Sequence, residues 1–236
     1  NGCTFINVTS TNNSAYRGGS SFIRGNNTSI KNCTLDGNNA TLRGGGLNIA
    51  GENCTVDNVS VSNNTAGLNG GAVFINNTYG GDESIVVTMD KSYKSENNTA
   101  VNGSGGAICI DAISSSSSTA DLEFSQGCSF ENNTAGANGG AIFADVSNAD
   151  LNWRNVNFTN NTAGANGGAI YLNGANGLKL DIDEMNFKNN TANCSGGAIF
   201  VNHTQGYYSN VELTVHDNCI FENNTAGVNG GAIAVE

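Results

Sequence analysis

One short pattern recurs eight times and constrains the fold more than any other feature of the chain. Its centre is a Gly-Gly pair, which the best copies precede with Phe-x-Asn-Asn-Thr-Ala and follow with Ala-Ile. The Gly-Gly pairs begin at residues 18, 44, 70, 105, 139, 167, 196 and 230, at intervals of 26 to 35 residues. Repeats of this length at variable spacing predict a solenoid whose coils carry loop insertions.

Apolar residues within a repeat alternate with a period of two, as in Leu178-x-Leu180-x-Ile182, and show no helical periodicity. Each repeat divides into three extended segments: residues 169–172, residues 178–182 and the residues around Phe187. Three short strands per coil predict an all-β, right-handed parallel β-helix of about eight coils. At ~4.8 Å per coil the rod would be on the order of 35–40 Å long. A propeller needs four strands in about 40–50 residues, which is longer than every one of these intervals.

Composition agrees with a rod of stacked strands and excludes two functional classes. None of the 236 residues is Pro, and Pro is excluded from central strands. The net charge is −11 with nine Lys and Arg, which argues against nucleic-acid binding because phosphate contacts need clustered cations. The apolar runs are too short for a transmembrane helix. We interpret residues 1–236 as a single repeat array, a segment or subunit of a longer rod.

The repeat residues have separable structural roles. Gly-Gly predicts a tight corner with positive φ or close backbone approach. The Phe positions predict an internal aromatic column that Val61 and Leu35 continue, consisting of Phe130, Phe158, Phe187 and Phe221. The second Asn of each pair predicts a hydrogen-bonded ladder along the stack, formed by Asn64, Asn98, Asn133, Asn161, Asn190 and Asn224. The alternative is that this Asn only tolerates a left-handed corner.

Gly-Gly-Ala-Ile alternating with Phe-x-x-Asn, as in Phe130/Asn133, Phe158/Asn161, Phe187/Asn190 and Phe221/Asn224, resembles the repeat pair of chlamydial polymorphic outer-membrane proteins. The chain is also similar to adhesin-like β-helix surface proteins of methanogenic archaea, which share Asn-Asn-Thr-Ala and Gly-Gly-Ala-Ile strings. The resemblance covers nearly the whole chain. It implies a secreted β-helix that serves in adhesion or surface structure, at an extracellular or cell-surface location.

Asn-x-Ser/Thr sequons are unusually dense and predict N-glycosylation of a secreted protein. The alternative is that β-helix turns simply need Asn and Thr. Within Asn-Asn-Thr the sequon Asn is the first of the pair, so Asn63, Asn97, Asn132, Asn160, Asn189 and Asn223 should face solvent in a line. The candidate glycosylation sites are Asn7, Asn12, Asn26, Asn27, Asn32, Asn39, Asn53, Asn58, Asn63, Asn76, Asn97, Asn102, Asn132, Asn157, Asn160, Asn189, Asn193, Asn202 and Asn223.

The chain has seven Cys residues and no C-x-x-C motif, a pattern that disfavours a zinc site. No cofactor motif is present. Neighbouring coils can place two Cys residues for a disulfide, and Cys3 with Cys33 is the candidate pair. The alternative is a free thiol packed in the stack as a small hydrophobe.

Insertions and chain ends suggest partners. The longer repeats carry extra residues at one corner, in 76–84, 111–120 and 202–209, which could form a face for host or surface glycans or proteins. Tyr79, Tyr207 and Tyr208 in these insertions could stack on sugars. Tolerated surface loops are the alternative. The chain ends in mid-repeat and begins with residues that resemble the continuation of such a strand. We therefore expect head-to-tail self-association into an extracellular fibre.

Catalysis has one weak candidate. Asp181 and Asp183 alternate onto one strand face beside Lys179, with Glu184 following and Asp145 and Asp150 one repeat earlier. Polysaccharide lyases and hydrolases need clustered carboxylates, but an outward strand face is polar in any case. Ice binding through the repeated Thr is a further alternative, but glycans on the adjacent Asn would obstruct a flat ice-binding face. The sequence thus predicts a secreted, glycosylated structural or adhesive surface protein and no enzyme. A β-helical carbohydrate-active enzyme, a polysaccharide lyase or hydrolase, is the alternative.

Overall fold

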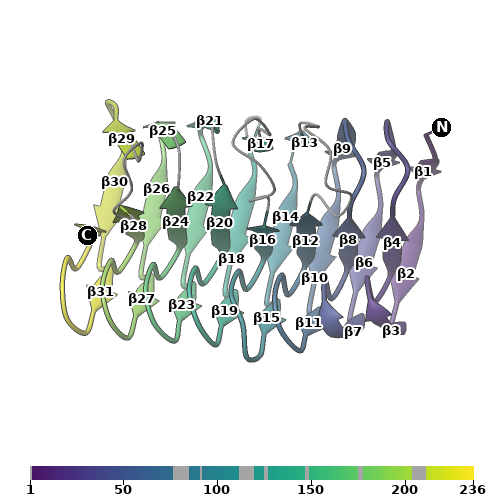
Figure 1. Ribbon diagram of the computed structural model, residues 1–236, viewed down its shortest axis with the longest axis horizontal. Helices are drawn as coiled ribbons and strands as arrows, with labels where there is room; N and C mark the ends of the chain where they lie inside the picture. Colours follow the sequence, from purple (N-terminus) through teal and green to yellow (C-terminus); the bar gives the residue numbers. More distant parts are fainter. Residues whose placement is uncertain are drawn as a thin grey trace.

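The structure, a computed structural model, describes residues 2–76, 85–90, 92–111, 120–124, 127–146, 149–174, 178–203 and 211–236. These residues form 32 short strands and no helix, and every strand pair is parallel. The strands stack as eight coils along one axis, with the first and last coils at opposite ends of the rod (Figure 1). The all-β class and the right-handed parallel β-helix predicted from the sequence are confirmed.

Each coil contributes one strand to each of four faces, which we number in chain order. Sheet 1 contains β1 (Thr4–Ile6), β5 (Ser29–Lys31), β9 (Cys54–Asp57), β13 (Ile85–Asp90) and β17 (Ala120–Phe124), and the same face continues as β21 (Asp150–Arg154), β25 (Leu178–Asp183) and β29 (Val211–Val215). Sheet 2 contains β2 (Thr9–Thr11), β6 (Thr34–Asp36), β10 (Ser60–Ser62), β14 (Lys94–Glu96), β18 (Ser129–Glu131), β22 (Asn157–Thr159), β26 (Asn186–Lys188) and β30 (Ile220–Glu222).

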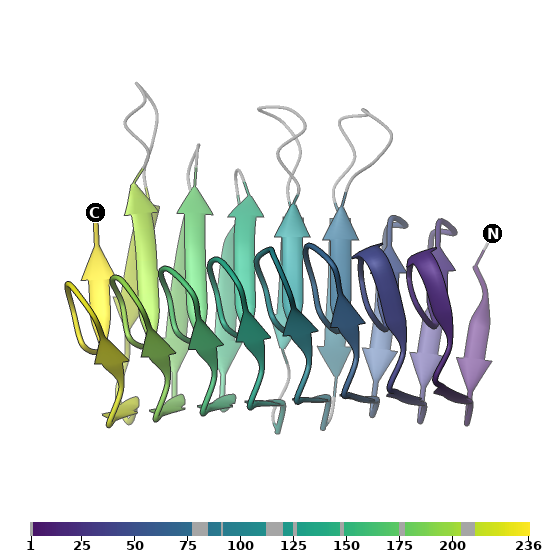
Figure 2. The same ribbon diagram turned by 90° about the horizontal axis from the view of Figure 1, so that it is seen from below.

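The other two faces complete each coil. Sheet 3 contains β3 (Ser14–Arg17), β7 (Asn39–Arg43), β11 (Thr65–Ala66), β15 (Thr99–Ala100), β19 (Thr134–Ala135), β23 (Thr162–Ala163), β27 (Thr191–Ala192) and β31 (Thr225–Ala226). Sheet 4 contains β4 (Ser21–Ile23), β8 (Leu47–Ile49), β12 (Val73–Asn76), β16 (Ile108–Asp111), β20 (Ile142–Val146), β24 (Ile170–Gly174), β28 (Ile199–His203) and β32 (Ile233–Val235). Figure 2 shows the strands of this sheet side by side along the rod.

Sheet 3 is a fourth strand position that the sequence pattern did not reveal. In six of its eight members it is only the two-residue Thr-Ala segment of the repeat. Two residues are too few to display a period of two, so the alternation of apolar residues does not distinguish this strand from the segment around Phe. The other three strand positions coincide with the three predicted segments, as β24, β25 and β26 show.

The Gly-Gly corner works as expected, with a different role for each glycine. Gly167 has a φ of 68°, a left-handed conformation that Gly adopts without steric cost. Gly168 lies against the next coil, where a Cβ atom would collide with the backbone oxygen of Gly197. The pair therefore turns the chain and lets two backbones approach at the same corner.

The interior is a set of apolar columns that run along the rod. Phe130, Phe158, Phe187 and Phe221 stack in register, with ring centroids 4.9–5.1 Å apart and interplanar angles of 6–7°. Leu35 and Val61 occupy the same column, as predicted. Ser95, which is buried, interrupts it between Val61 and Phe130. The aromatic column is therefore confirmed over the last four coils and continued by smaller residues.

The predicted Asn ladder is present and extends through all eight coils. In each step the backbone N–H and the side-chain amide of one Asn both donate to Oδ1 of the Asn in the next coil. Asn161, for example, donates to Asn190 Oδ1 at 3.0 Å from both atoms. Asn64, Asn98, Asn133, Asn161 and Asn190 are completely buried. Asn13 and Asn38 are also members of the ladder, although the degenerate first copies hid them in the sequence.

Candidate functional site

The first Asn of each pair lies at a left-handed corner. Asn63, Asn97, Asn132, Asn160, Asn189 and Asn223 all have φ between 54° and 57°, whereas the second Asn of the pair does not have positive φ. The left-handed explanation considered for the second Asn therefore applies to the first one, and the second one forms the ladder. Five of these six residues are exposed and Asn132 is half-buried, so the row faces solvent largely as predicted.

This corner geometry bears on how the sequons are interpreted. Twelve of the 19 sequon Asn residues have positive φ, a conformation that Asn tolerates better than other non-glycine residues. The other seven do not require Asn for that reason. The first group consists of Asn7, Asn12, Asn27, Asn32, Asn53, Asn58, Asn63, Asn97, Asn132, Asn160, Asn189 and Asn223. The second consists of Asn26, Asn39, Asn76, Asn102, Asn157, Asn193 and Asn202.

Neighbouring polar groups already engage some sequon amides. Asn63 donates from Nδ2 to Asp36 Oδ1 at 2.7 Å, and this bond, with a second from Ser62, holds the pKa of Asp36 below its usual value. Asn58 donates from Nδ2 to Asn32 Oδ1 at 2.9 Å. An amide that carries a sugar keeps one N–H, so these bonds and glycosylation are compatible.

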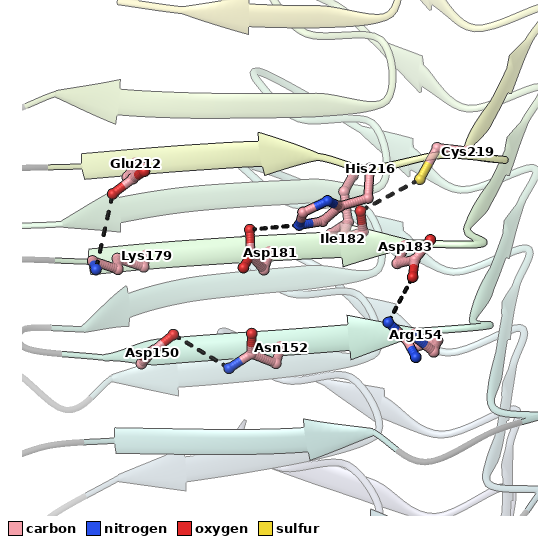
Figure 3. Close-up of polar contacts among 10 residues, drawn as sticks. All are labelled: Asp150, Asn152, Arg154, Lys179, Asp181, Ile182, Asp183, Glu212, His216 and Cys219. Carbon is pink, nitrogen blue, oxygen red and sulfur yellow. Dashed lines mark hydrogen bonds and ion pairs between the residues drawn. The ribbon is translucent and has the colours of Figure 1, made fainter.

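The acidic cluster predicted from the sequence lies on the outward face of the last three strands of sheet 1 (Figure 3). Asp181 and Asp183 point outward from β25, as their alternation predicts. Asp181 Oδ1 lies 3.3 Å from Nε2 of His216, the residue that directly follows β29. Asp183 Oδ2 lies 2.6 Å from the guanidinium of Arg154 on β21. Lys179 faces Glu212 at 4.0 Å. Asp183 and Lys179 thus each have an opposite charge beside them from the neighbouring coil, and Asp181 has an imidazole nitrogen.

These side chains surround a shallow hollow of about 230 Å³ lined by Asn152, Trp153, Arg154, Asp181, Asp183 and His216. Of the residues named in the sequence analysis, the hollow contains Asp181 and Asp183. Glu184 lies at an exposed left-handed corner. Asp145 lies on sheet 4 and does not join the cluster. Arg154 and His216 were missed, and only the register of β21, β25 and β29 brings them to the aspartates.

Asp145 belongs to a second polar column, on sheet 4. It aligns with Asp111 and Asn173 in the neighbouring coils, and Asn173 Nδ2 donates to Asp145 Oδ1 at 2.7 Å. Burial raises the pKa of Asp145; the hydrogen bond from Asn173 opposes this shift and the charge of Asp111 adds to it. Asp145 and Asn173 of this outer column are therefore hydrogen-bonded from one coil to the next, as the Asn residues of the interior ladder are.

Cys3 and Cys33 do not form the disulfide proposed from the sequence. All seven Cys residues are free thiols in the structure. Ser29 N–H donates to Cys3 O, which places Cys3 in the column that continues to Cys54. Cys33 lies at a different corner, one position before β6, and its thiol is buried against the carbonyl oxygen of Lys31 at 3.1 Å. The buried-thiol alternative describes Cys33.

The predicted sugar-stacking tyrosines, Tyr79, Tyr207 and Tyr208, lie outside the described residues, as do most of the insertions 76–84, 111–120 and 202–209. Within the part of the chain that the structure describes, no helix has the length and hydrophobicity that crossing a membrane requires.

Comparison with known families supports the assignment of the repeat. The model of the Chlamydia polymorphic membrane protein repeat matches residues 127–145, 155–173, 184–202 and 218–236. Each match begins just before a strand of sheet 2 and ends within a strand of sheet 4 or, in the last coil, one residue after it, so it covers the Phe, Asn-Asn and Gly-Gly positions of one coil. The resemblance found in the sequence is therefore confirmed for the last four coils. No curated protein and no solved structure gives a significant match to the chain.

Proposed function

We propose that this chain is a rod-shaped structural or adhesive part of a cell-surface protein, exported and N-glycosylated along its corners. The observation that carries the proposal is the match of four consecutive coils to the Chlamydia polymorphic membrane protein repeat. The fold adds that each coil buries its apolar residues and presents short polar strands outward. Such a rod offers long faces for contact at a surface.

Glycosylation of the corner row is supported by the exposure of its Asn residues. Consecutive corners are one coil apart, about 4.8 Å, which is close to the width of a single sugar ring. Branched glycans on adjacent coils would collide, so we expect partial occupancy of the row. Sugars on the seven sequons outside left-handed corners would support a role for glycosylation more strongly than sugars on the corner row, because corner geometry does not explain those seven Asn residues.

Intact-mass measurement of protein from its native source, before and after enzymatic deglycosylation, tests this part of the proposal. A large mass decrease with several occupied sites per molecule is expected, and peptide mapping would locate them. Identical masses before and after treatment would refute glycosylation and leave the rod itself unaffected.

End-to-end association is supported by the edges of the terminal coils. The strands β1 to β4 and β29 to β32 each have a neighbour on one side only. Exposed apolar residues gather at the same two regions, among them Ile6, Val8, Ile220 and Val235. A further coil, supplied by the same chain or by another, would pair these edges. Electron microscopy of native material tests this: fibres longer than eight coils are expected, and separate short rods would count against a fibre.

A further inference from the structure

The chain's charge is distributed unevenly along the rod. Residues 1–52 carry four basic side chains and two acidic ones, whereas residues 53–236 carry five basic and 18 acidic ones. Three of the four arginines, Arg17, Arg24 and Arg43, lie in that first segment. The first coils are thus locally cationic in a protein whose net charge is −11.

Two of these arginines line one small pocket. Arg17 at the end of β3 and Arg43 at the end of β7 are in register on sheet 3. With Phe22, Asn48, Phe74 and Asn76 of sheet 4 they enclose about 60 Å³. This is room for two water molecules or for a single carboxylate group. Figure 2 shows the first strands of sheet 4 at the N-terminal end of the rod, where this pocket lies.

The pocket holds a donor and an acceptor that the protein leaves without a partner. Arg43 Nε is buried and makes no hydrogen bond, and neither does the Oδ1 atom of Asn48, a residue only 2% exposed. Unsatisfied buried groups of this kind are uncommon and costly. Among the described residues, no carboxylate lies within ion-pair distance of Arg17 or Arg43. Two positive side chains in register on adjacent coils therefore line the pocket without a paired carboxylate.

The walls beside these polar groups are aromatic. The Arg43 guanidinium lies 4.8 Å from the ring centroid of Phe74, and that of Arg24 lies 5.0 Å from Phe22. Phe22, which lines the pocket, is 41% exposed. Aromatic faces of this kind pack against the apolar face of a sugar ring, and arginine pairs with carboxylates through two parallel hydrogen bonds.

We propose that this pocket, formed by Arg17, Arg43 and Asn48, binds the carboxylate of an acidic sugar in a polysaccharide. The carboxylate accepts hydrogen bonds from both guanidinium groups, including the buried Nε of Arg43. A neighbouring hydroxyl of the same sugar donates to Asn48 Oδ1, a donor that fully deprotonated anions such as sulfate lack. The ring stays outside the small pocket and packs on Phe22. The proposal does not depend on fibre formation, but it requires that Asn76 at the pocket carry no glycan, because a sugar on that sequon would block the site.

The acidity of the rest of the rod does not prevent this binding. Exposed charges farther away than a Debye length, about 8 Å at physiological ionic strength, are largely screened. Asp111 is the exception, because it is in register with Asn76 of the pocket and its charge opposes binding, so the two guanidinium groups must outweigh it. Binding should weaken as salt is added, because Arg17 is exposed.

Isothermal titration calorimetry with tetragalacturonate tests the proposal. The protein is made in a host without N-glycosylation, because Asn76 at the pocket is itself in a sequon. Arg17→Gln and Arg43→Gln should each weaken binding at least tenfold. Lys31→Gln is the matched control, since it removes the same charge from the same segment but on sheet 1. It should leave the affinity within twofold of that of the unmodified chain.

Comparison ligands and a folding check complete the experiment. Uncharged galactotetraose should not bind, and galactose 6-sulfate should bind more weakly than galacturonate. Arg17 is exposed, so Arg17→Gln should retain the circular dichroism spectrum even if Arg43→Gln unfolds the first coils. No binding of tetragalacturonate, binding of the sulfated sugar alone, or an equal loss with Lys31→Gln would each overturn the proposal.

Discussion

The two adjacent Asn residues of one repeat offer a sharp test of the roles assigned to them. Asn161 is completely buried, and its side chain makes four hydrogen bonds of 3.0–3.1 Å. It accepts from the backbone N–H and the side-chain amide of Asn133, and it donates to Phe130 O and Asn190 Oδ1. Asn160, one residue earlier, is exposed and has a φ of 57°.

Asn161→Ala should destabilise the protein by roughly 2–6 kcal/mol, because the buried Asn133 N–H and Phe130 O both lose this partner at about 1–3 kcal/mol each. Asn160→Gly should change the stability by less than about 1 kcal/mol, because Gly accepts positive φ without strain. Only the second variant removes the sequon, so unglycosylated protein is used for both.

Urea unfolding followed by the fluorescence of Trp153 measures both effects. Trp153 is the chain's single Trp and is 1% exposed in the coil that contains both Asn residues. The midpoint for Asn161→Ala should fall strongly, and that for Asn160→Gly should stay close to the original. A loss below about 1 kcal/mol for Asn161→Ala, or equal losses for the two variants, would refute the assigned roles.

Three further predictions concern other columns. Phe158→Ala should lower the free energy of unfolding in urea by about 3–5 kcal/mol, because it empties a buried position between two stacked rings. Tyr16→Ala is the control, and because this side chain is 63% exposed, the change should be less than about 0.5 kcal/mol. Asp145→Asn should stabilise the protein at neutral pH, because burial raises the folded-state pKa of Asp145 and so disfavours its ionised form. That advantage should disappear as the pH falls below the unfolded value of about 4, where the carboxyl is protonated in both states, and a gain that persists in acid would contradict this cause. Thiol titration with a chromogenic disulfide should label Cys3 rapidly in the native protein and all seven thiols after unfolding; fewer than seven would reveal a disulfide.

The fold was largely predictable because short patterns that specify it recur in every copy of the repeat. Gly-Gly predicts a corner, alternation of apolar residues predicts a strand, and identical residues in successive copies must stack if each copy forms one coil. The same logic placed the Phe column and the ladder correctly. It failed where a copy is degenerate, as at Asn38, or where a segment is too short to show a period, as at Thr162–Ala163. It also left open which Asn of a pair is left-handed, because both are compatible with a corner.

The candidate sites depended much more on tertiary structure. Sequence alone determined the repeat, the number of coils, the interior columns and the outward alternation of Asp181 and Asp183. The sequence did not predict that those aspartates contact Arg154 and His216. It also did not predict that Cys3 and Cys33 occupy different positions in their coils. Loop lengths between the coils vary, so residues 25 to 35 positions apart become neighbours only when the strands pair. Outer-face contacts therefore follow from register, whereas the interior follows from the chemistry of the repeat itself.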